Sequence, residues 1–184
     1  SYFNMRLHML PPGSLDTLLI ALDTYAPTLG ESRLPDGKLI TDRAEFFLLI
    51  TNYKAELYTS QAYDLYGNWF GVSDSLQLFH SIATNFAPWR IVRWRNNSGP
   101  NEIQYIGDMR VNRLNLPPTS LDAVTIDSNF IDIRLPWILI NFSDPSMMKV
   151  IHDYRSFAGT EDTISDGISV SIFYKNFSGN TQSR

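Results

Sequence analysis

Residues 129–146 read "NFIDIRLPWILINFSDPS", an apolar run that holds a charged pair, a proline and a tryptophan. Side chains alternate between the two faces of a β-strand, so a strand here has one apolar and one charged face. The apolar face consists of Ile131, Ile133, Leu135 and Trp137. Asp132 and Arg134 lie on the other face, where we expect them to meet partners on adjacent strands and to set register and solubility. The stretch therefore predicts a core strand rather than a catalytic centre.

The residues after this strand predict where it ends and which element comes next. Pro136 cannot donate to a strand ladder, so it marks the end of the strand. Trp137 is predicted to be a core residue, and its replacement by alanine is expected to lower the free energy of unfolding by about 3 to 5 kcal/mol. Pro145 and Ser146 are typical of a helix start, so a short helical element is predicted in "DPSMM".

Period-two alternation recurs near both ends of the chain, in Phe3–Leu10 and Gly167–Lys175. Further strands are predicted at Leu18–Thr24, Ala44–Ile50, Ala55–Ala62, Arg90–Arg95, Glu102–Val111, Phe130–Leu135 and Lys149–Asp153. Clusters of turn-forming residues separate them, and Thr119 or Ser120 can cap a helical turn in "PPTSLDAV". The pattern predicts an all-β fold, an antiparallel, jelly-roll-like β-sandwich with long loops and short helical turns. No linker or repeat divides it, so a single domain is predicted over residues 1–184.

The composition argues against several partners. The formal charge is -4 with a calculated pI near 5.3, and no run of Lys or Arg is dense, so nucleic acid is not expected. No apolar segment approaches the roughly 18 residues that a bilayer needs, which predicts no membrane insertion. Cysteine is absent, which removes disulfides and thiolate chemistry. The chain begins "SYFNMRLHML", from which we expect a soluble piece of a larger polypeptide.

Catalytic motifs are absent from the sequence. The histidines His8, His80 and His152 stand singly, and no Gly-x-Ser-x-Gly motif occurs. A retaining glycosidase needs two carboxylates about 5 Å apart, whereas Glu45 and Asp132 stand alone in their predicted strands. Catalysis is therefore not predicted, but carboxylates of different strands can meet in space, so a glycoside-acting enzyme stays the third alternative.

Loop aspartates are numerous, and two interpretations of them stay open. Carboxylates and loop carbonyls can hold a structural calcium ion in such a sandwich, although no EF-hand spacing occurs. Aspartates that make turns and caps are the favoured interpretation. No other metal or cofactor is predicted.

Aromatic and polar residues gather in the aperiodic segment Tyr63–Pro88 and just after it. Proteins bind sugars by placing an aromatic ring beneath the face of the sugar and hydrogen-bonding its hydroxyl rim. The candidate ligand-binding residues are Asp64, Tyr66, Asn68, Trp69, Trp89 and Trp94. Trp69 is the best candidate for an exposed ring because Gly67 and Gly71 surround it, and one of the other two tryptophans is expected to be buried. The alternative is that these rings plug the open end of the sandwich.

Four segments resemble one known family in their order. They are "IALDTYAPTLGE" (20–31), "RAEFFLLI" (43–50), "IDIRLPWILINF" (131–142) and "DGISVSIFY" (166–174). This order is similar to that of family 9-like carbohydrate-binding modules and the wider DOMON-like sandwiches. The resemblance implies a β-sandwich that binds polysaccharide without catalysis, as an accessory domain of a secreted or cell-surface bacterial protein that acts on glycans. In that family a tryptophan pair clamps a sugar; Trp69, Trp89 and Trp94 are candidates for it from their chemistry alone.

Two functions of different classes therefore stand side by side. The first is binding of a polysaccharide or oligosaccharide, outside the cell or at its surface. The second is a structural or interaction domain that packs on a neighbouring domain of the same cell-envelope polypeptide, which predicts that the loop aromatics are covered there.

Overall fold

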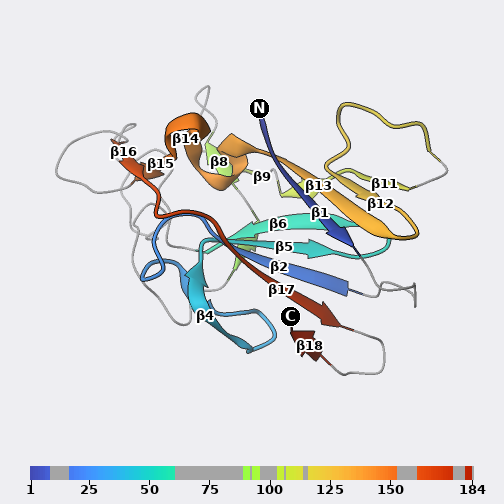
Figure 1. The fold of residues 1–184 in the computed structure, drawn as a ribbon, viewed down its shortest axis with the longest axis horizontal. Helices are drawn as coiled ribbons and strands as arrows, with labels where there is room; N and C mark the ends of the chain where they lie inside the picture. The colour runs from blue at the N-terminus through green and yellow to red at the C-terminus, as the bar shows by residue number, and fades with distance from the viewer. Residues whose placement is uncertain are drawn as a thin grey trace.

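The computed structural model of the chain is all-β, which confirms the predicted fold class. It describes residues 1–8, 17–60, 89–91, 93–95, 103–105, 107–113, 116–152, 161–175 and 181–183. Within these ranges the chain forms strands joined by turns and two short 3-10 helices (Figure 1). No helix in the described part of the chain is long and apolar enough to cross a bilayer.

The smaller of the two main sheets contains β1 (Tyr2–His8), β11 (Val111–Arg113), β12 (Val124–Ile126) and β13 (Phe130–Pro136). Their order across the sheet is β1, β13, β12, β11. β13 pairs antiparallel with both of its neighbours, whereas β11 and β12 run parallel. β13 has the predicted alternation, because Ile131, Ile133 and Leu135 are at most 1 % exposed. Pro136 is its last residue, as predicted.

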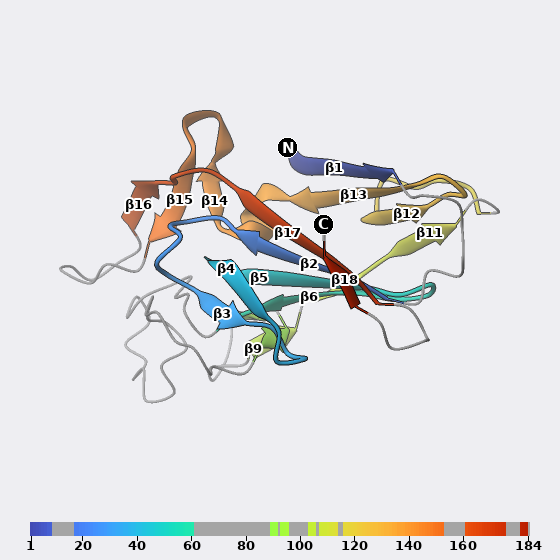
Figure 2. The ribbon, with the colours of Figure 1, turned by 60° about the horizontal axis from the view of Figure 1, so that its bottom comes forward.

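The larger sheet contains β2 (Thr17–Asp23), β5 (Phe46–Ile50), β6 (Ala55–Thr59), β7 (Arg90–Ile91), β10 (Asp108–Met109), β17 (Ser169–Lys175) and β18 (Thr181–Ser183). Its order is β10, β6, β5, β2, β17, β18, and β7 also pairs with β6. All these pairs are antiparallel. The two sheets lie face to face (Figure 2), which is the predicted sandwich arrangement.

Apolar side chains fill the space between the sheets. The smaller sheet contributes Val124, Ile131, Ile133 and Leu135. The larger sheet contributes Leu18, Ile20, Leu22, Phe46, Leu48, Ile50, Ala55 and Leu57. Each set consists of alternate residues of its strands, because only one face of a strand can point at the other sheet. This burial is the main source of the stability of the domain.

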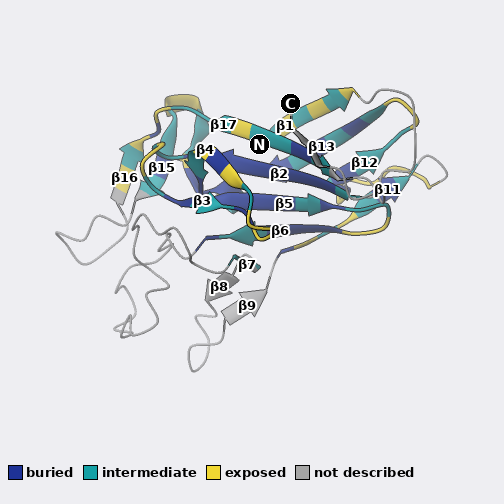
Figure 3. Ribbon diagram, turned by 90° about the horizontal axis from the view of Figure 1, so that it is seen from below, coloured by how far each residue is buried: buried dark blue, intermediate teal, exposed yellow. Residues whose placement is uncertain are grey.

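The larger sheet is also covered on its second face, along β2 and β5 (Figure 3). The hairpin of β3 (Glu31–Arg33) and β4 (Leu39–Ala44) lies against this face. The second cluster consists of Leu19, Ala21, Leu34, Ile40, Ala44, Phe47 and Phe173. β2 is therefore buried on both faces, which explains why "LLIAL" is apolar throughout instead of alternating.

The remaining elements form small units. They are the sheet of β14 (Phe142–Asp144), β15 (Lys149–His152) and β16 (Glu161–Ile164), the hairpin of β8 (Arg93–Arg95) and β9 (Ile103–Tyr105), and the helices η1 (Trp137–Ile140) and η2 (Pro145–Met147). Asp144 caps η2 by accepting a hydrogen bond from Ser146 N–H, which confirms the predicted helical start. "PPTSLDAV" instead forms a turn, in which Asp122 N–H donates to Thr119 O at 3.2 Å, and runs into β12.

Trp137 begins η1, where it packs on the core from one side. Its ring makes edge contacts with Phe3 and Phe142, with ring centroids 5.5 and 5.0 Å away. The prediction of a packing role is confirmed, but the side chain is half-buried rather than enclosed.

Three predicted strands are wrong in their bounds. The predicted strand Arg90–Arg95 is divided into β7, which pairs with β6, and β8, which pairs with β9 in a different sheet. The predicted strand Ala44–Ile50 contains a bend at Glu45, which separates β4 from β5. The predicted strand Glu102–Val111 is interrupted by Gly107, which divides β9 from β10. Gly107 lies so close to Ile91 that a Cβ atom would overlap Ile91 Cγ2, so only glycine fits there.

Candidate functional site

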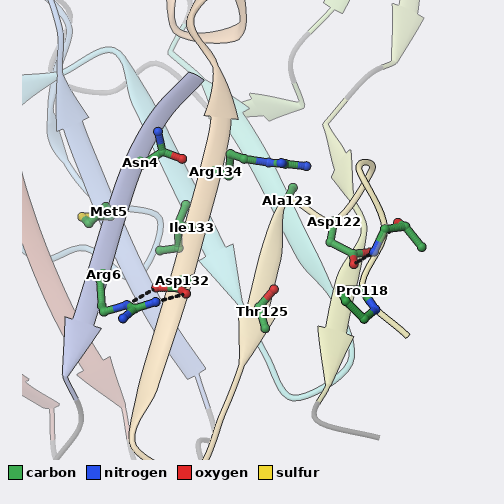
Figure 4. Close-up of a pocket in the computed structure, with 11 residues that line it drawn as sticks. Asn4, Met5, Arg6, Pro118, Asp122, Ala123, Thr125, Asp132, Ile133 and Arg134 are labelled. Carbon is green, nitrogen blue, oxygen red and sulfur yellow. Dashed lines mark hydrogen bonds and ion pairs between the residues drawn. The ribbon is translucent and has the colours of Figure 1, made fainter. Parts of the chain in front are cut away.

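The outer face of the smaller sheet carries a polar pocket with a volume of about 530 Å³. Strands β1, β12 and β13 and residues 118–123 form it (Figure 4). Its polar lining consists of Asn4, Arg6, Thr119, Asp122, Thr125, Asp132 and Arg134. Its apolar lining consists of Met5, Pro118, Ala123 and Ile133. We call it the sheet-face pocket; its volume lies within the range of about 300 to 1,000 Å³ that is typical of small-molecule sites.

The register of the sheet arranges the polar side chains in two rows. In the first row Arg6 is opposite Asp132, and Asp132 is opposite Thr125. In the second row Asn4 is opposite Arg134. Because side chains alternate along each strand, the residues that face the core lie between these rows, and the polar ones all point outward.

Arg6 and Asp132 form a bidentate ion pair between β1 and β13. Arg6 Nε donates to Asp132 Oδ1 and Arg6 Nη2 donates to Asp132 Oδ2, each at 2.6 Å. The guanidinium also lies over the ring of Phe130, 4.3 Å from its centroid. The hydrogen bonds from Arg6, together with its charge, lower the pKa of Asp132 below its usual value. The pair holds both side chains in place at one end of the pocket.

Arg134 lies at the other end of the pocket. Its guanidinium lies over the ring of Tyr2, 4.6 Å from the centroid, and its Nη2 donates to the carbonyl oxygen of Ser120. An arginine has five N–H donors in a rigid plane. Among the described residues no carboxylate pairs with Arg134, and its other N–H groups have no acceptor. They are therefore free to bind a ligand.

Asp122 holds the segment that forms one wall of the pocket. Its Oδ2 accepts hydrogen bonds from Thr119 N–H at 2.7 Å and Asn112 Nδ2 at 2.8 Å. Its Oδ1 accepts from Thr119 Oγ1 at 3.0 Å and pairs with Arg110 Nε at 2.9 Å. The Thr119 N–H, followed by these other donors, lowers the pKa of Asp122. Asp122 is ionised and fully occupied with positioning the wall.

A second group of carboxyls lies inside the domain, at the ends of β2 and β5. Leu22 pairs with Phe46, and this register brings Asp23 beside Glu45. The two carboxyls interact with each other, and Glu45 Oε2 accepts a hydrogen bond from Thr24 N–H at 2.8 Å. Burial raises the pKa of Glu45 well above its usual value, and the negative charge of Asp23 adds to this effect. Burial raises the pKa of Asp23 as well.

This carboxyl pair is enclosed by the protein. Glu45 is 0 % exposed and Asp23 is 5 % exposed. Gly30, at φ +77°, closes over the pair, because a Cβ atom there would be 2.6 Å from Glu45 Oε1. Glu45 thus meets a carboxylate of a different strand, as the sequence left open. The pair belongs to the interior of the fold, where a substrate could reach it only if the covering turn moved.

Most of the predicted aromatic site lies outside the described residues. The residues that lie outside are Asp64, Tyr66, Asn68 and Trp69. Trp94 lies in β8. Trp89 is half-buried, with its Nε1 donating to Arg33 O at 3.0 Å and its ring 5.7 Å from that of Phe47. Its indole N–H thus has a partner inside the domain, and its role as a ligand contact stays a prediction.

The sheet-face pocket contains residues that the sequence did not single out as a site. The alternation placed Asp132 and Arg134 on an outward face, which is confirmed. Asn4 and Arg6 come from the same kind of alternation in β1. The available signal was that both strands carry polar residues at every second position. Neither strand's sequence, however, specifies that the two strands pair with each other.

Comparisons with known proteins add no relative: no family model matches the chain, and no curated protein or solved structure is significantly similar to it. Within the described ranges no three metal-ligating side chains lie close enough together to hold a metal ion. The described residues of the sheet-face pocket offer hydrogen bonding and charge pairing.

Proposed function

We propose that the domain is a non-catalytic carbohydrate-binding module and that the sheet-face pocket takes a sugar unit. We further propose that it serves as an accessory domain of a secreted or cell-surface protein that acts on glycans. The observation that carries the proposal is the pocket itself, in which fixed polar side chains from three adjacent strands line a cavity large enough for a sugar unit.

The hydrogen-bonding groups of the pocket suit a ligand rich in hydroxyls. The Thr125 hydroxyl has no hydrogen-bond partner among the described residues, and Asn4 uses only its Nδ2, which donates to Tyr2 O at 3.1 Å. A sugar hydroxyl both donates and accepts, so two different hydroxyls of one sugar unit can satisfy the Thr125 hydroxyl and the Asn4 amide oxygen. Since β-strands hold these groups, little conformational entropy is lost when a ligand binds.

Affinity electrophoresis and calorimetry against a panel of plant and bacterial polysaccharides test this function. We expect Thr125→Val and Asn4→Ala each to weaken binding by about five- to twentyfold, because each removes a hydrogen bond worth about 1 to 2 kcal/mol. Lys38→Ala, in a turn of the β3–β4 hairpin, is the control. Trp69→Ala tests the loop site predicted from sequence. If no polysaccharide binds, the proposed function is wrong; if only Trp69→Ala weakens binding, the loop is the site.

A second function, docking on a neighbouring domain, has one observation in its favour. Met147 and Ile164 are 60 % and 72 % exposed at one end of the three-stranded sheet. They lie close together because Lys149 pairs with Ile164 and Ser165 N–H donates to Met148 O. In the full-length polypeptide, Met147→Ser with Ile164→Ser would then loosen the contact between domains, measured as protease sensitivity of the junction. Unchanged sensitivity would remove this candidate.

A further inference from the structure

The charges of the sheet-face pocket differ between its two ends. At one end Arg6 is bound to Asp132 through both oxygens, and Asp127 adds a second negative charge near Arg6. At the other end Arg134 has no carboxylate partner within the described part of the chain. The only other carboxylate in the lining is Asp122, which already binds four donors. The Arg134 end is therefore positive and the Arg6 end is not.

Arg134 is also held ready for a planar anion. The guanidinium lies over the Tyr2 ring, and its Nη2 donates to Ser120 O, so two contacts limit the movement of the side chain. The free N–H groups then form a rigid edge whose spacing matches the two oxygens of a carboxylate. The side chain loses little further freedom when that carboxylate binds.

We propose that the ligand is an acidic glycan, in which the carboxylate of a uronic acid unit binds the free edge of Arg134. This inference rests on the proposed carbohydrate-binding function and specifies its ligand class. A uronic acid carries one carboxylate on a ring that otherwise bears hydroxyls. The pocket has the matching groups: Arg134 is a cation without a carboxylate partner among the described residues, Asn4 lies opposite it, and Thr125 lies in the other row, opposite Asp132. A neutral sugar leaves the Arg134 charge without a counterion.

The test compares each acidic polysaccharide with its own neutral form. Polygalacturonate, alginate and hyaluronan are titrated by calorimetry into the 184-residue chain, each beside its carboxyl-methylated ester. We expect at least one acid to bind about ten- to a hundredfold more tightly than its ester, the value of a charge-assisted hydrogen bond. Arg134→Gln is expected to abolish that difference without weakening ester binding, and Arg134→Lys to restore part of it. The preference should decrease at high salt.

Arg113→Gln is the matched control. Arg113 lies over the ring of Tyr53 at 4.4 Å and its Nε donates to Asn52 O at 2.6 Å, so it has the same kind of contacts outside the pocket lining. Its loss removes the same charge and should leave the acid preference intact. Thermal unfolding of each variant shows whether it is folded.

The outcomes distinguish failure of the proposed ligand class from failure of the proposed function. Equal binding of acid and ester, binding of neutral glycans alone, or an acid preference that survives Arg134→Gln overturns this inference and leaves carbohydrate binding standing. The absence of binding to every polysaccharide overturns both.

Discussion

Replacement of Glu45 by glutamine is expected to stabilise the domain at neutral pH and to remove much of its pH dependence. Glu45 is fully buried, its Oε2 accepts from Thr24 N–H, and its carboxyl lies beside that of Asp23. Its Oε1 has no hydrogen-bond partner among the described residues, so nothing there offsets the cost of a buried negative charge. Glutamine keeps the oxygen that accepts from Thr24 N–H and carries no charge at any pH.

The magnitude follows from the proton that the folded state retains. Burial and Asp23 raise the pKa of Glu45 in the folded state, whereas in the unfolded chain the group has an ordinary pKa of about 4.3. The stabilising contribution is therefore complete below that value and decreases as the pH rises towards the folded-state pKa. For one proton the free energy of unfolding decreases by up to about 1.4 kcal/mol per pH unit over this range. Glutamine carries no titratable proton and avoids this loss.

Urea unfolding followed by tryptophan fluorescence, at pH steps from 4.5 to 8.5, measures the effect. The curves of wild type and Glu45→Gln should meet near pH 4.5 and separate progressively above it, with the variant more stable. Asp36→Asn removes an exposed carboxylate in the β3–β4 turn and serves as the control. Two curves that stay parallel from pH 5 to 8 would refute the claim that folded Glu45 holds a proton.

Three further substitutions test the packing and the pocket wall. Trp137→Ala should lower the free energy of unfolding by about 2 to 4 kcal/mol. This is less than for an enclosed tryptophan, because the ring is half-buried and has two edge contacts. A loss below about 1 kcal/mol by urea unfolding would contradict its role in the core. Gly30→Ala should lower the free energy of unfolding by about 2 to 4 kcal/mol in the same assay, because φ is +77° and the new Cβ atom would lie 2.6 Å from Glu45 Oε1. A variant as stable as wild type would show that the turn moves freely. Asp122→Asn should accelerate hydrogen exchange of the Thr119 amide severalfold, since a charged acceptor becomes neutral; unchanged exchange would mean that other contacts hold the wall.

Local sequence patterns predicted two kinds of strand: those that bury one face and those that are buried on both faces. β13 alternates over its whole length, and β2 is an uninterrupted apolar run, so both could be located within one or two residues. The β3–β4 hairpin could not, because β3 has only three residues and its pairing contains an irregularity between Glu31 and Arg33. Its turn, "LPDG", was the available signal: Gly37 N–H donates to Leu34 O at 2.8 Å.

The groups that give the site its chemistry depend on pairing between distant strands. Arg6 and Asp132 are 126 residues apart, and neither sequence context specifies the other. The same holds for Asp23 and Glu45, which meet only because β2 pairs with β5 in a particular register. A shift of either register by one residue would turn these side chains to the opposite face. Sequence alternation can therefore predict which face a charged residue takes, but the partner on that face follows from the tertiary pairing.

The location of the pocket follows from how each sheet is covered. Along β2 and β5 the larger sheet has the smaller sheet on one face and the β3–β4 hairpin on the other, so the alternate residues of these strands are largely buried on both sides. The smaller sheet has the larger one on its inner face, and its outer face carries Arg6, Asp132 and Arg134. The stretch "FIDIRLP" contributes to both faces of the smaller sheet. Its isoleucines and leucine fill the core, and the two charged residues between them line the pocket. One of these charges is paired within the sheet, and the other has N–H donors without an acceptor among the described residues.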